Sequence, residues 1–165
     1  MNVMTFAHFK VKRLVRMGSK LKYALMLKRE LQSAHWMLKR NGLDYMVNEL
    51  KAYKKTEERV EREISVVRSI VGSALAMGYK VSVHDSECWA VRQSTDKAAI
   101  MAEIYTTDMN TLKFRNQAGE SVGFVSLVYG NSASEVMSDW TDSEEMNKIL
   151  DNAKKQCDRY AAKGW

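Results

Sequence analysis

The sequence contains no proline, two cysteines and three histidines among its 165 residues. Without proline, no helix is interrupted by a residue that lacks an amide hydrogen, so long helices and short turns are expected. Cys88 and Cys157 lie far apart and match neither a disulfide framework nor a zinc spacing, which favours a reducing, cytoplasmic compartment. The histidines, His8, His35 and His84, are too scattered to form a metal motif.

Long apolar runs are also missing. No stretch approaches the roughly 18 consecutive apolar residues of a membrane span. The first 17 residues carry four basic side chains and lack the apolar core of a signal peptide. Because 45% of the residues are hydrophobic and 28% are charged, the chain can bury the core of one domain, or of one domain with an appendage. We expect a globular protein of the cytoplasm.

Motifs that carry chemistry are absent as well. There is no Gly-x-Ser-x-Gly nucleophile and no glycine-rich junction between a strand and a helix that binds phosphate. His84 and Cys88 are close in sequence, and Asp85 or Glu87 would have to join them to hold a metal, so turn residues and a packed thiol are the simpler interpretation. The sequence therefore predicts no catalytic, metal or cofactor site, and no enzyme.

Positive charge is concentrated at the N-terminus. Residues 1–55 hold 13 Lys or Arg against three acidic residues, whereas residues 56–165 hold 13 against 17. This asymmetry indicates an anionic partner for the first segment, or a basic segment that rests on an acidic body. The residues predicted to contact a partner protein or nucleic acid are Lys10, Lys12, Arg13, Arg16, Lys20, Lys22, Lys28, Arg29 and Trp36.

The first half of the chain has the periodicity of helices. The spacing predicts a short amphipathic helix over residues 4–17, a second helix from Lys20 to about Arg40, and a stop at Asn41-Gly42. A third helix is expected over residues 43–55. Thr56 then resembles an N-cap, followed by a helix over 57–77. We expect residues 1–55 to form a basic helical segment and residues 56–165 to form an α+β domain entered through that long helix.

The second half alternates between strand and helix patterns. A hairpin is expected around Asp85–Glu87, and a second hairpin pairs residues 112–115 with residues 122–129. Apolar residues occur on both faces of the latter strand, which predicts an interior strand of a mainly antiparallel sheet with other elements packed on each side. Ser94–Asp96 should cap a short helix, and Thr141–Glu144 has the pattern of a capping box that opens the last helix.

Cys157 lies on the apolar stripe of that last helix and is expected to be a buried structural thiol. Large aromatic residues near a surface are common binding anchors. Trp89, Trp140 and Trp165 are candidates of this kind, although a C-terminal Trp that docks on its own domain is an equally good interpretation.

Residues 79–142 resemble small proteins encoded by tailed bacteriophages and prophages. The resemblance is carried by a hairpin whose strand contains Trp89, and by the short motifs Ser94-Thr95-Asp96, Thr107-Asp108, Leu112–Arg115, Val128–Asn131 and Asp139 with Thr141. It does not extend to residues 1–55. It implies a small protein made in the bacterial host cell, and it transfers no catalytic residue because the group has no assigned activity.

The expected function is that of a non-enzymatic phage accessory protein, which binds a host or defence-system macromolecule as an inhibitor or modulator. A protein partner is preferred. The alternative is nucleic-acid binding through the basic N-terminal helices. This binding would not depend on base sequence, because no motif that reads base edges occurs there. No membrane span is expected, and the sequence leaves homo-oligomerisation open.

Overall fold

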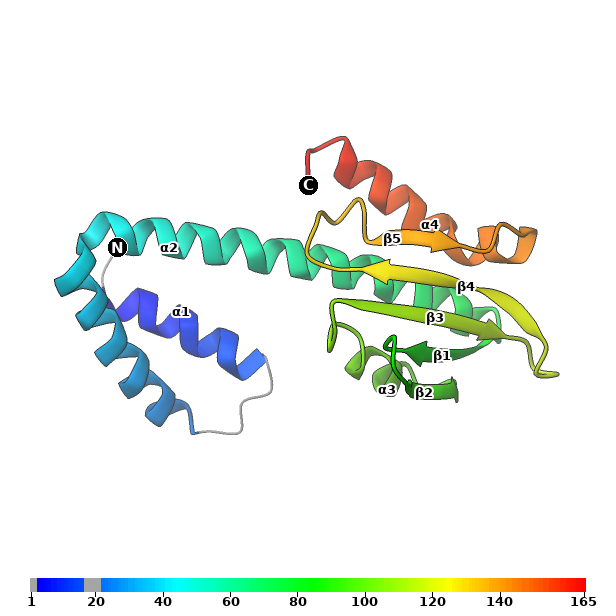
Figure 1. The fold of residues 1–165 in the computed structure, drawn as a ribbon, viewed down its shortest axis with the longest axis horizontal. Helices are drawn as coiled ribbons and strands as arrows, with labels where there is room; N and C mark the ends of the chain where they lie inside the picture. Colours follow the sequence, from blue (N-terminus) through cyan, green and yellow to red (C-terminus); the bar gives the residue numbers. More distant parts are fainter. Residues whose placement is uncertain (1–2, 17–21) are drawn as a thin grey trace. The chain divides into compact units, whose positions relative to one another are not determined.

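The computed structural model describes residues 3–16 and 22–165 and has an α+β fold (Figure 1), which confirms the predicted fold class. The helices are α1 (Val3–Arg16), α2 (Tyr23–Ala76), α3 (Lys97–Ala102) and α4 (Glu144–Ala161). The strands are β1 (Lys80–His84), β2 (Trp89–Ser94), β3 (Met109–Arg115), β4 (Ser121–Val128) and β5 (Met137–Trp140). The chain divides into two compact units, residues 1–56 and 57–165, called here the N-terminal and C-terminal units.

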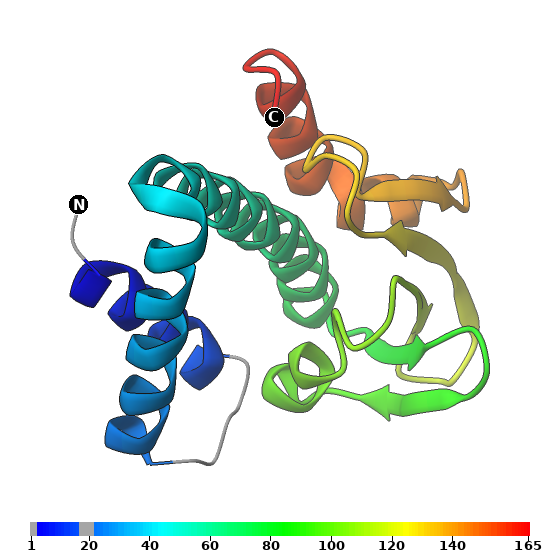
Figure 2. The same cartoon turned by 60° about the vertical axis from the view of Figure 1, so that its left-hand side comes forward.

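The N-terminal unit is built from α1 and the first part of α2, which lie side by side in Figures 1 and 2. Its core is a small cluster of four buried side chains from these helices, namely Phe6, Ala34, Met46 and Leu50. Ala7 and Val11 are also fully buried, so the predicted amphipathic helix does bury one apolar face.

The helical path of α2 is broken at Gly42, where φ is 80° and ψ is 173°. A side chain with a Cβ atom is strained at this positive φ, whereas glycine is not. The stop predicted at Asn41-Gly42 is therefore confirmed as a sharp change of direction between two helical stretches.

The helix boundary predicted at Thr56 is wrong, because α2 continues through this residue. The Thr56 hydroxyl does not cap a new helix; it donates a hydrogen bond of 3.0 Å to the carbonyl oxygen of Ala52, one turn earlier. Neither proline nor glycine occurs between Leu43 and Val71, so nothing in the backbone opposes one long helix. At the far end α2 stops at Ala76, one residue before the predicted end of the helix, and Gly78 adopts φ 80° two residues later.

The C-terminal unit contains a five-stranded antiparallel sheet in the order β2-β1-β3-β4-β5. The two predicted hairpins are present, joined by the turns at residues 85–88 and 116–120. Because β4 pairs with β3 on one side and with β5 on the other, the prediction of an interior strand is confirmed.

One face of this sheet, the core face, carries the main hydrophobic core. Val83, Leu112 and Val125 occupy neighbouring positions on it and are fully buried. Side chains of α2, α3 and α4 all join the same core, so these helices cover one side of the sheet. Figure 1 shows the sheet in front of the end of α2, and Figure 2 shows it beside this end of the helix. Within this unit, the expectation that both faces of β4 are covered is not met.

Gly123 lets α4 approach β4 closely. A Cβ atom at this position would lie 2.6 Å from Cγ of Met146, which is far inside van der Waals contact. Met146, Ile149, Leu150, Ala153 and Cys157 form the buried stripe of α4, in agreement with the predicted helix. Burial of Cys157 is confirmed, and desolvation raises the pKa of its thiol to about 11.

The cap of α4 differs from the predicted one. Ser143 is the N-cap residue, and its hydroxyl accepts a hydrogen bond of 3.2 Å from the amide of Met146. Thr141 instead extends the sheet: its amide donates to the carbonyl oxygen of Phe124, and its hydroxyl accepts from the amide of Phe124, both at 3.1 Å. The cap expected at Ser94–Asp96 is confirmed, with Asp96 accepting from the first amides of α3.

Candidate functional site

The basic residues predicted to contact a partner all belong to the N-terminal unit. Lys12, Lys22, Lys28 and Arg29 are exposed. Arg13 and Arg16 lie on α1, but their side chains, like the whole of Lys20, fall outside the described part of the structure. The exposed cations whose side chains are described are therefore available to an anionic partner.

Lys10 is the exception among these residues. Its ammonium group lies 3.0 Å from a carboxylate oxygen of Glu30, and the exposed fractions of the two side chains are 24% and 12%. The amine also lies 5.7 Å from the centre of the Phe6 ring. The ion pair between Lys10 and Glu30 thus joins α1 to α2 within the unit. Lys10 therefore has a structural role and is not a free contact residue.

Trp36 is 57% exposed, and the guanidinium carbon of Arg40 lies 5.0 Å from its ring centre. The geometry is that of an exposed cation–π pair, which keeps the aromatic face oriented without burying it. Tyr23 donates to or accepts from Nδ1 of His8 at 2.8 Å, so its ring is also held in place while remaining 41% exposed.

Large exposed apolar side chains are concentrated in the same unit. Among the described residues, most of the exposed large hydrophobic side chains precede residue 57: Met4, Tyr23, Leu25, Trp36, Leu43 and Tyr45. A shallow, mainly apolar groove also runs along the first part of α2, and its lining consists of Ala24, Leu27, Lys28, Leu31, Gln32 and His35. Exposed apolar surface of this density is a common sign of a binding surface.

The turn between β1 and β2 holds the cluster that was predicted to consist of turn residues and a packed thiol; Cys88 is exposed, so the prediction of a packed thiol is wrong. Asp85 accepts hydrogen bonds from the amides of Cys88 and Glu87, at 2.7 and 3.1 Å, and these bonds lower the pKa of its carboxyl. The Cys88 thiol donates to the other carboxylate oxygen at 3.4 Å, which raises its pKa. A thiol with a raised pKa is a weak nucleophile. Among the described residues, no group of three or more acidic, His or Cys side chains is placed to hold a metal ion.

A buried polar cluster surrounds Glu63, which sequence considerations missed. Glu63 lies on α2 and is fully buried. Its carboxylate accepts a hydrogen bond of 2.6 Å from the hydroxyl of Tyr105 and one of 3.2 Å from the amide of Gly130. Arg59, one turn earlier, places Nε 3.7 Å from the same carboxylate and donates to the carbonyl oxygen of Gly130 at 2.6 Å. In the sequence, Glu63 stands three residues before Val66 and four before Val67. This spacing places its carboxylate on the same helix face as these apolar residues.

The second layer of this cluster is centred on Asn110, which is 2% exposed. Its side-chain oxygen accepts from the Tyr129 hydroxyl at 3.0 Å and from the Tyr105 amide at 3.3 Å. Burial, followed by the hydrogen bond to Glu63, raises the pKa of Tyr105 to about 12. Burial also raises the pKa of Tyr129. Tyr105 has a positive φ of 71°, a strained conformation that these bonds hold in place.

Both oxygens of Glu63 are occupied by donors from the protein itself. The cluster therefore joins α2 to the segment before β3 and to the turn after β4, and it is a structural anchor rather than a reactive carboxylate. Removing one member would leave buried donors without an acceptor, and such orphaned groups are costly.

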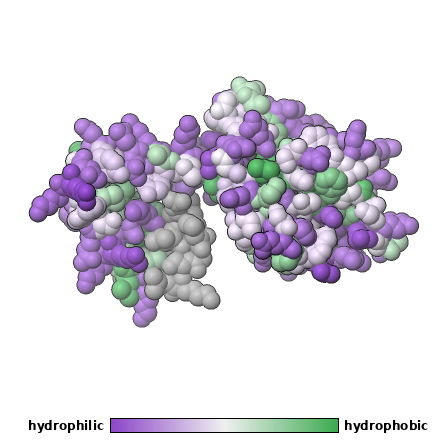
Figure 3. All heavy atoms as spheres, viewed as in Figure 1, coloured by the Kyte–Doolittle hydropathy of each residue, from purple (hydrophilic) through white to green (hydrophobic). Residues whose placement is uncertain are grey.

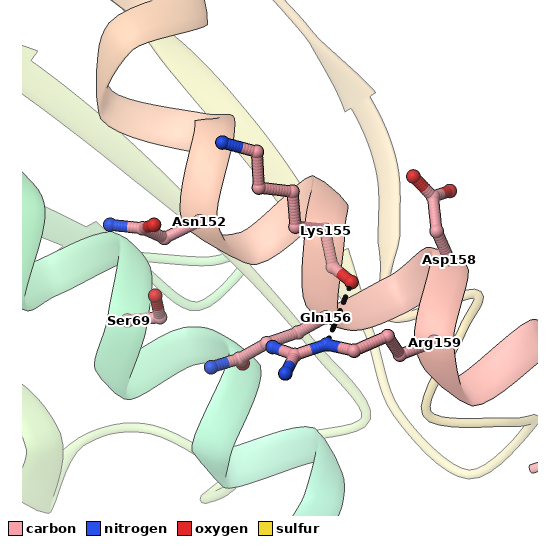
Figure 4. A pocket seen from close by; sticks show the side chains of 6 residues that line it. All are labelled: Ser69, Asn152, Lys155, Gln156, Asp158 and Arg159. Atoms are coloured by element: carbon pink, nitrogen blue, oxygen red, sulfur yellow. Dashed lines mark hydrogen bonds between the residues drawn. The ribbon is translucent and has the colours of Figure 1, made fainter.

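A polar cleft lies between α2 and α4 in the C-terminal unit (Figure 4). It is lined by Ser69 of α2 and by Asn152, Lys155, Gln156, Asp158 and Arg159 of α4. Two of its cations already have partners: Lys155 pairs with Asp151 at 2.7 Å, and Nε of Arg159 donates to the carbonyl oxygen of Lys155 at 3.1 Å. Figure 4 shows the Asp158 carboxylate directed away from Ser69. The cleft has no set of free groups converging on one point.

The predicted aromatic anchors are placed differently from one another. Trp89 and Trp140 are half-buried, whereas Trp165 is 41% exposed. Trp165 nevertheless folds back on its own unit, because its amide donates to the carbonyl oxygen of Tyr160 and its ring centre lies 3.9 Å from the guanidinium carbon of Arg62. Of the two interpretations left open for this residue, docking on its own domain agrees with these contacts.

In the described residues, no helix is both long enough and apolar enough to cross a membrane. Comparison with protein-family models, with curated proteins and with solved structures gave no match. The function therefore has to be argued from the geometry of the chain itself.

Proposed function

We propose that this is a non-enzymatic binding protein whose N-terminal unit docks on an acidic protein surface. The observation that carries the proposal is the combination, on one unit, of exposed apolar side chains with exposed cations. Leu25 is 62% exposed and Trp36 is 57% exposed, while Lys22, Lys28 and Arg29 are exposed nearby in the sequence. An apolar centre surrounded by charge is the usual anatomy of a protein interface.

A protein partner accounts for these residues better than nucleic acid does. Leucine side chains have no ring to stack on a base, so Leu25 and Leu43 gain only from contact with another apolar surface. The surrounding cations would steer an acidic partner and would make its association faster at low salt. The resemblance to phage proteins supports a host or defence-system protein as this partner, with inhibition or modulation as the result.

The proposal is tested by purifying the tagged full-length chain from infected bacterial cells and identifying co-eluting proteins by mass spectrometry. The double variant Leu25→Ser with Trp36→Ser should lose the partner, because both side chains are exposed and their removal leaves the fold intact. Met77→Ser is the matched control, since Met77 is also exposed, at 40%, but belongs to the C-terminal unit. A partner retained by the double variant would contradict the proposal.

A second candidate function is sequence-nonspecific nucleic-acid binding by the same basic helices. The excess of 13 Lys and Arg over three acidic residues in positions 1–55 favours it. Each phosphate contact with a duplex would contribute about −0.9 to the slope of log affinity against log salt concentration. Co-elution of heterogeneous material that disappears on nuclease treatment, with no dominant protein, would support this function instead of the first.

A further inference from the structure

We propose that the face of the sheet opposite the main core binds single-stranded nucleic acid. We call it the outer face and define it by the side chains of Lys80, His84, Trp89, Arg92, Met109, Thr111, Lys113, Arg115, Phe124, Ser126 and Val128. The proposal is independent of the N-terminal unit, because every one of these residues belongs to the C-terminal unit.

The pairing of the strands places these side chains on one surface. Lys113 of β3 is opposite Phe124 of β4 and Ser82 of β1, whereas its sequence neighbours Leu112 and Phe114 point into the core. Directly paired residues of an antiparallel sheet point to the same face. Figure 1 is viewed toward this outer face, and Figure 3 shows apolar and hydrophilic side chains interspersed on it.

Helices of the C-terminal unit leave the outer face uncovered. Buried side chains of α2, α3 and α4 all join the core on the opposite side of the sheet. Trp89, Phe124 and Val128 do not belong to that core and are half-buried, and Lys113 and Arg115 are exposed. An uncovered sheet that carries aromatic residues is a suitable platform for bases that stack on it.

Two aromatic rings lie on either side of a central cation. The ammonium group of Lys113 lies 5.1 Å from the centre of the Trp89 ring, and Phe124 is its cross-strand neighbour on the other side. The guanidinium carbon of Arg92 also lies 5.8 Å from the Trp89 ring centre, and the His84 ring meets the same Trp edge-on at 4.9 Å. The strands that carry the two aromatic residues are three strand spacings apart, about 14 Å. A short single strand can span this distance.

The outer face is basic, although the C-terminal unit as a whole has more acidic than basic residues. Residues 56–165 hold more acidic than basic residues, 17 against 13. Yet Lys80, Arg92, Lys113 and Arg115 lie on the first three strands of the sheet order, β2, β1 and β3, and among the described residues none of them forms an ion pair. Arg115 donates to the carbonyl oxygen of Gly119 at 2.5 Å, which leaves its charge uncompensated.

The acidic residues closest to this surface lie at its margins. Asp85 and Glu87 belong to the turn beyond β1, and Glu120 is tied to Asn116 in the turn before β4. Asp139 is opposite Ser126, on the edge strand β5. On β2, β1, β3 and β4 the outer face is therefore basic and aromatic, whereas the acidic residues lie in the adjoining turns and on β5, so an anionic strand is directed across the first four strands.

Single strands fit this surface better than a duplex does. In a duplex the bases are stacked on one another and cannot lie on Trp89 or Phe124, whereas unpaired bases can. Every base has an aromatic face, so the expected binding depends little on sequence. Thr111 and Ser126 are two hydroxyl side chains on the same face, opposite one another, and are available to phosphate or sugar oxygens.

The experiment measures fluorescence anisotropy of labelled single-stranded DNA and RNA, each about 12 nucleotides long, with the full-length protein at two salt concentrations. The wild type should bind at micromolar concentration in low salt and should bind a duplex of the same sequence more weakly. Phe124→Leu should weaken binding about tenfold, because it keeps an apolar side chain but removes the stacking surface. Lys113→Gln should weaken binding and reduce the salt slope by about 0.7.

Two matched controls lie on the helical side of the same unit. Arg68→Gln removes an exposed cation of α2, and Trp165→Leu removes an exposed aromatic residue; neither should change the affinity. Because Lys113 is exposed, its variant reports on binding even if Phe124→Leu folds poorly.

Absence of binding at micromolar concentration in low salt would overturn the proposal. So would binding that is unchanged by both Phe124→Leu and Lys113→Gln, which would assign the nucleic acid to the basic N-terminal helices. Equal affinity for the duplex, or selective binding of an acidic peptide in place of the oligonucleotides, would also overturn it. The protein-docking proposal is tested separately, by the double variant Leu25→Ser with Trp36→Ser in the other unit.

Discussion

The two units of this chain differ in how much apolar surface they bury. Among the described residues, the core cluster of the N-terminal unit has four buried side chains, whereas that of the C-terminal unit has twenty. The N-terminal unit nevertheless exposes more large apolar side chains than the C-terminal unit does. A unit with a small core and an apolar surface gains stability by binding, whereas a unit with a large core does not require it.

The same contrast applies to polar groups. The C-terminal unit buries a carboxylate at Glu63 and satisfies it with donors from two distant segments. In the N-terminal unit, the Lys10–Glu30 pair remains partly exposed. Buried networks of this kind stabilise one arrangement of the chain, whereas a partly exposed pair contributes less. The comparison predicts different responses to substitution in the two units.

Leu127→Asp should have the largest effect. Leu127 is fully buried on the interior strand β4, so the new carboxylate would be left without a partner in the main core. We expect the C-terminal unit to lose more than about 4 kcal/mol and to unfold. Circular dichroism in the near-ultraviolet, followed through a thermal melt, measures this. A native-like melting transition would show that β4 is not part of the core.

Glu63→Ala should have the second-largest effect on stability. The substitution leaves the Tyr105 hydroxyl and the Gly130 amide without their acceptor, and we expect a loss of about 2–4 kcal/mol in the free energy of unfolding. Glu58→Ala is the matched control on the same helix, because Glu58 is exposed and pairs with Arg62 one turn later. Its cost should be about 0.5 kcal/mol. Urea denaturation measures both values, and similar costs would contradict the anchoring role of Glu63.

Alkaline pH should destabilise the C-terminal unit. The pKa of Tyr105 is raised from its ordinary value of 10.0 to about 12 in the folded chain. A group with a raised folded-state pKa contributes stability that is present below its unfolded pKa and is lost as pH rises toward the folded one. Stability should therefore fall between pH 10 and about 12. Tyr105→Phe should flatten this part of the profile, and an unchanged profile would contradict the assignment.

Removal of the N-terminal unit should have the smallest effect on the other unit. The main core contains no residue before Val66, so a chain that begins at Thr56 retains all of it. We expect this shortened chain to be soluble, with a melting temperature within a few degrees of the full-length transition. Aggregation, or loss of a cooperative transition in differential scanning calorimetry, would mean that the N-terminal helices belong to the same core.

Much of the fold could be predicted from periodicity. The helices, both hairpins and the interior position of β4 follow from patterns that are local in the sequence. The two errors in capping, at Thr56 and Thr141, have one cause: a threonine hydroxyl can bond in several backbone settings, and the sequence does not say which. Pairing with Phe124 of β4 decided the case of Thr141, whereas the Thr56 hydroxyl bonds within its own helix.

The sites were less predictable, because they depend on contacts between distant segments. Glu63 was not singled out in the sequence, because its partners Tyr105 and Gly130 come from distant segments that only the fold brings to it. Lys10 looked free until Glu30 was placed beside it. The outer face of the sheet requires the strand order, since Trp89 and Phe124 lie on strands that are not neighbours in the sheet. Composition alone indicated an acidic body and gave no sign of a basic surface on it.

The contrast between the two units is tested most directly by native-state hydrogen exchange of the full-length protein, resolved by residue. We expect amides of β1, β3 and β4 to exchange only through global unfolding, and amides of α1 and the first part of α2 to exchange through opening events of much lower free energy. Adding the captured protein partner should raise protection in the N-terminal unit alone. Equal protection of both units in the free protein would contradict the proposal that the N-terminal unit gains stability by binding a partner.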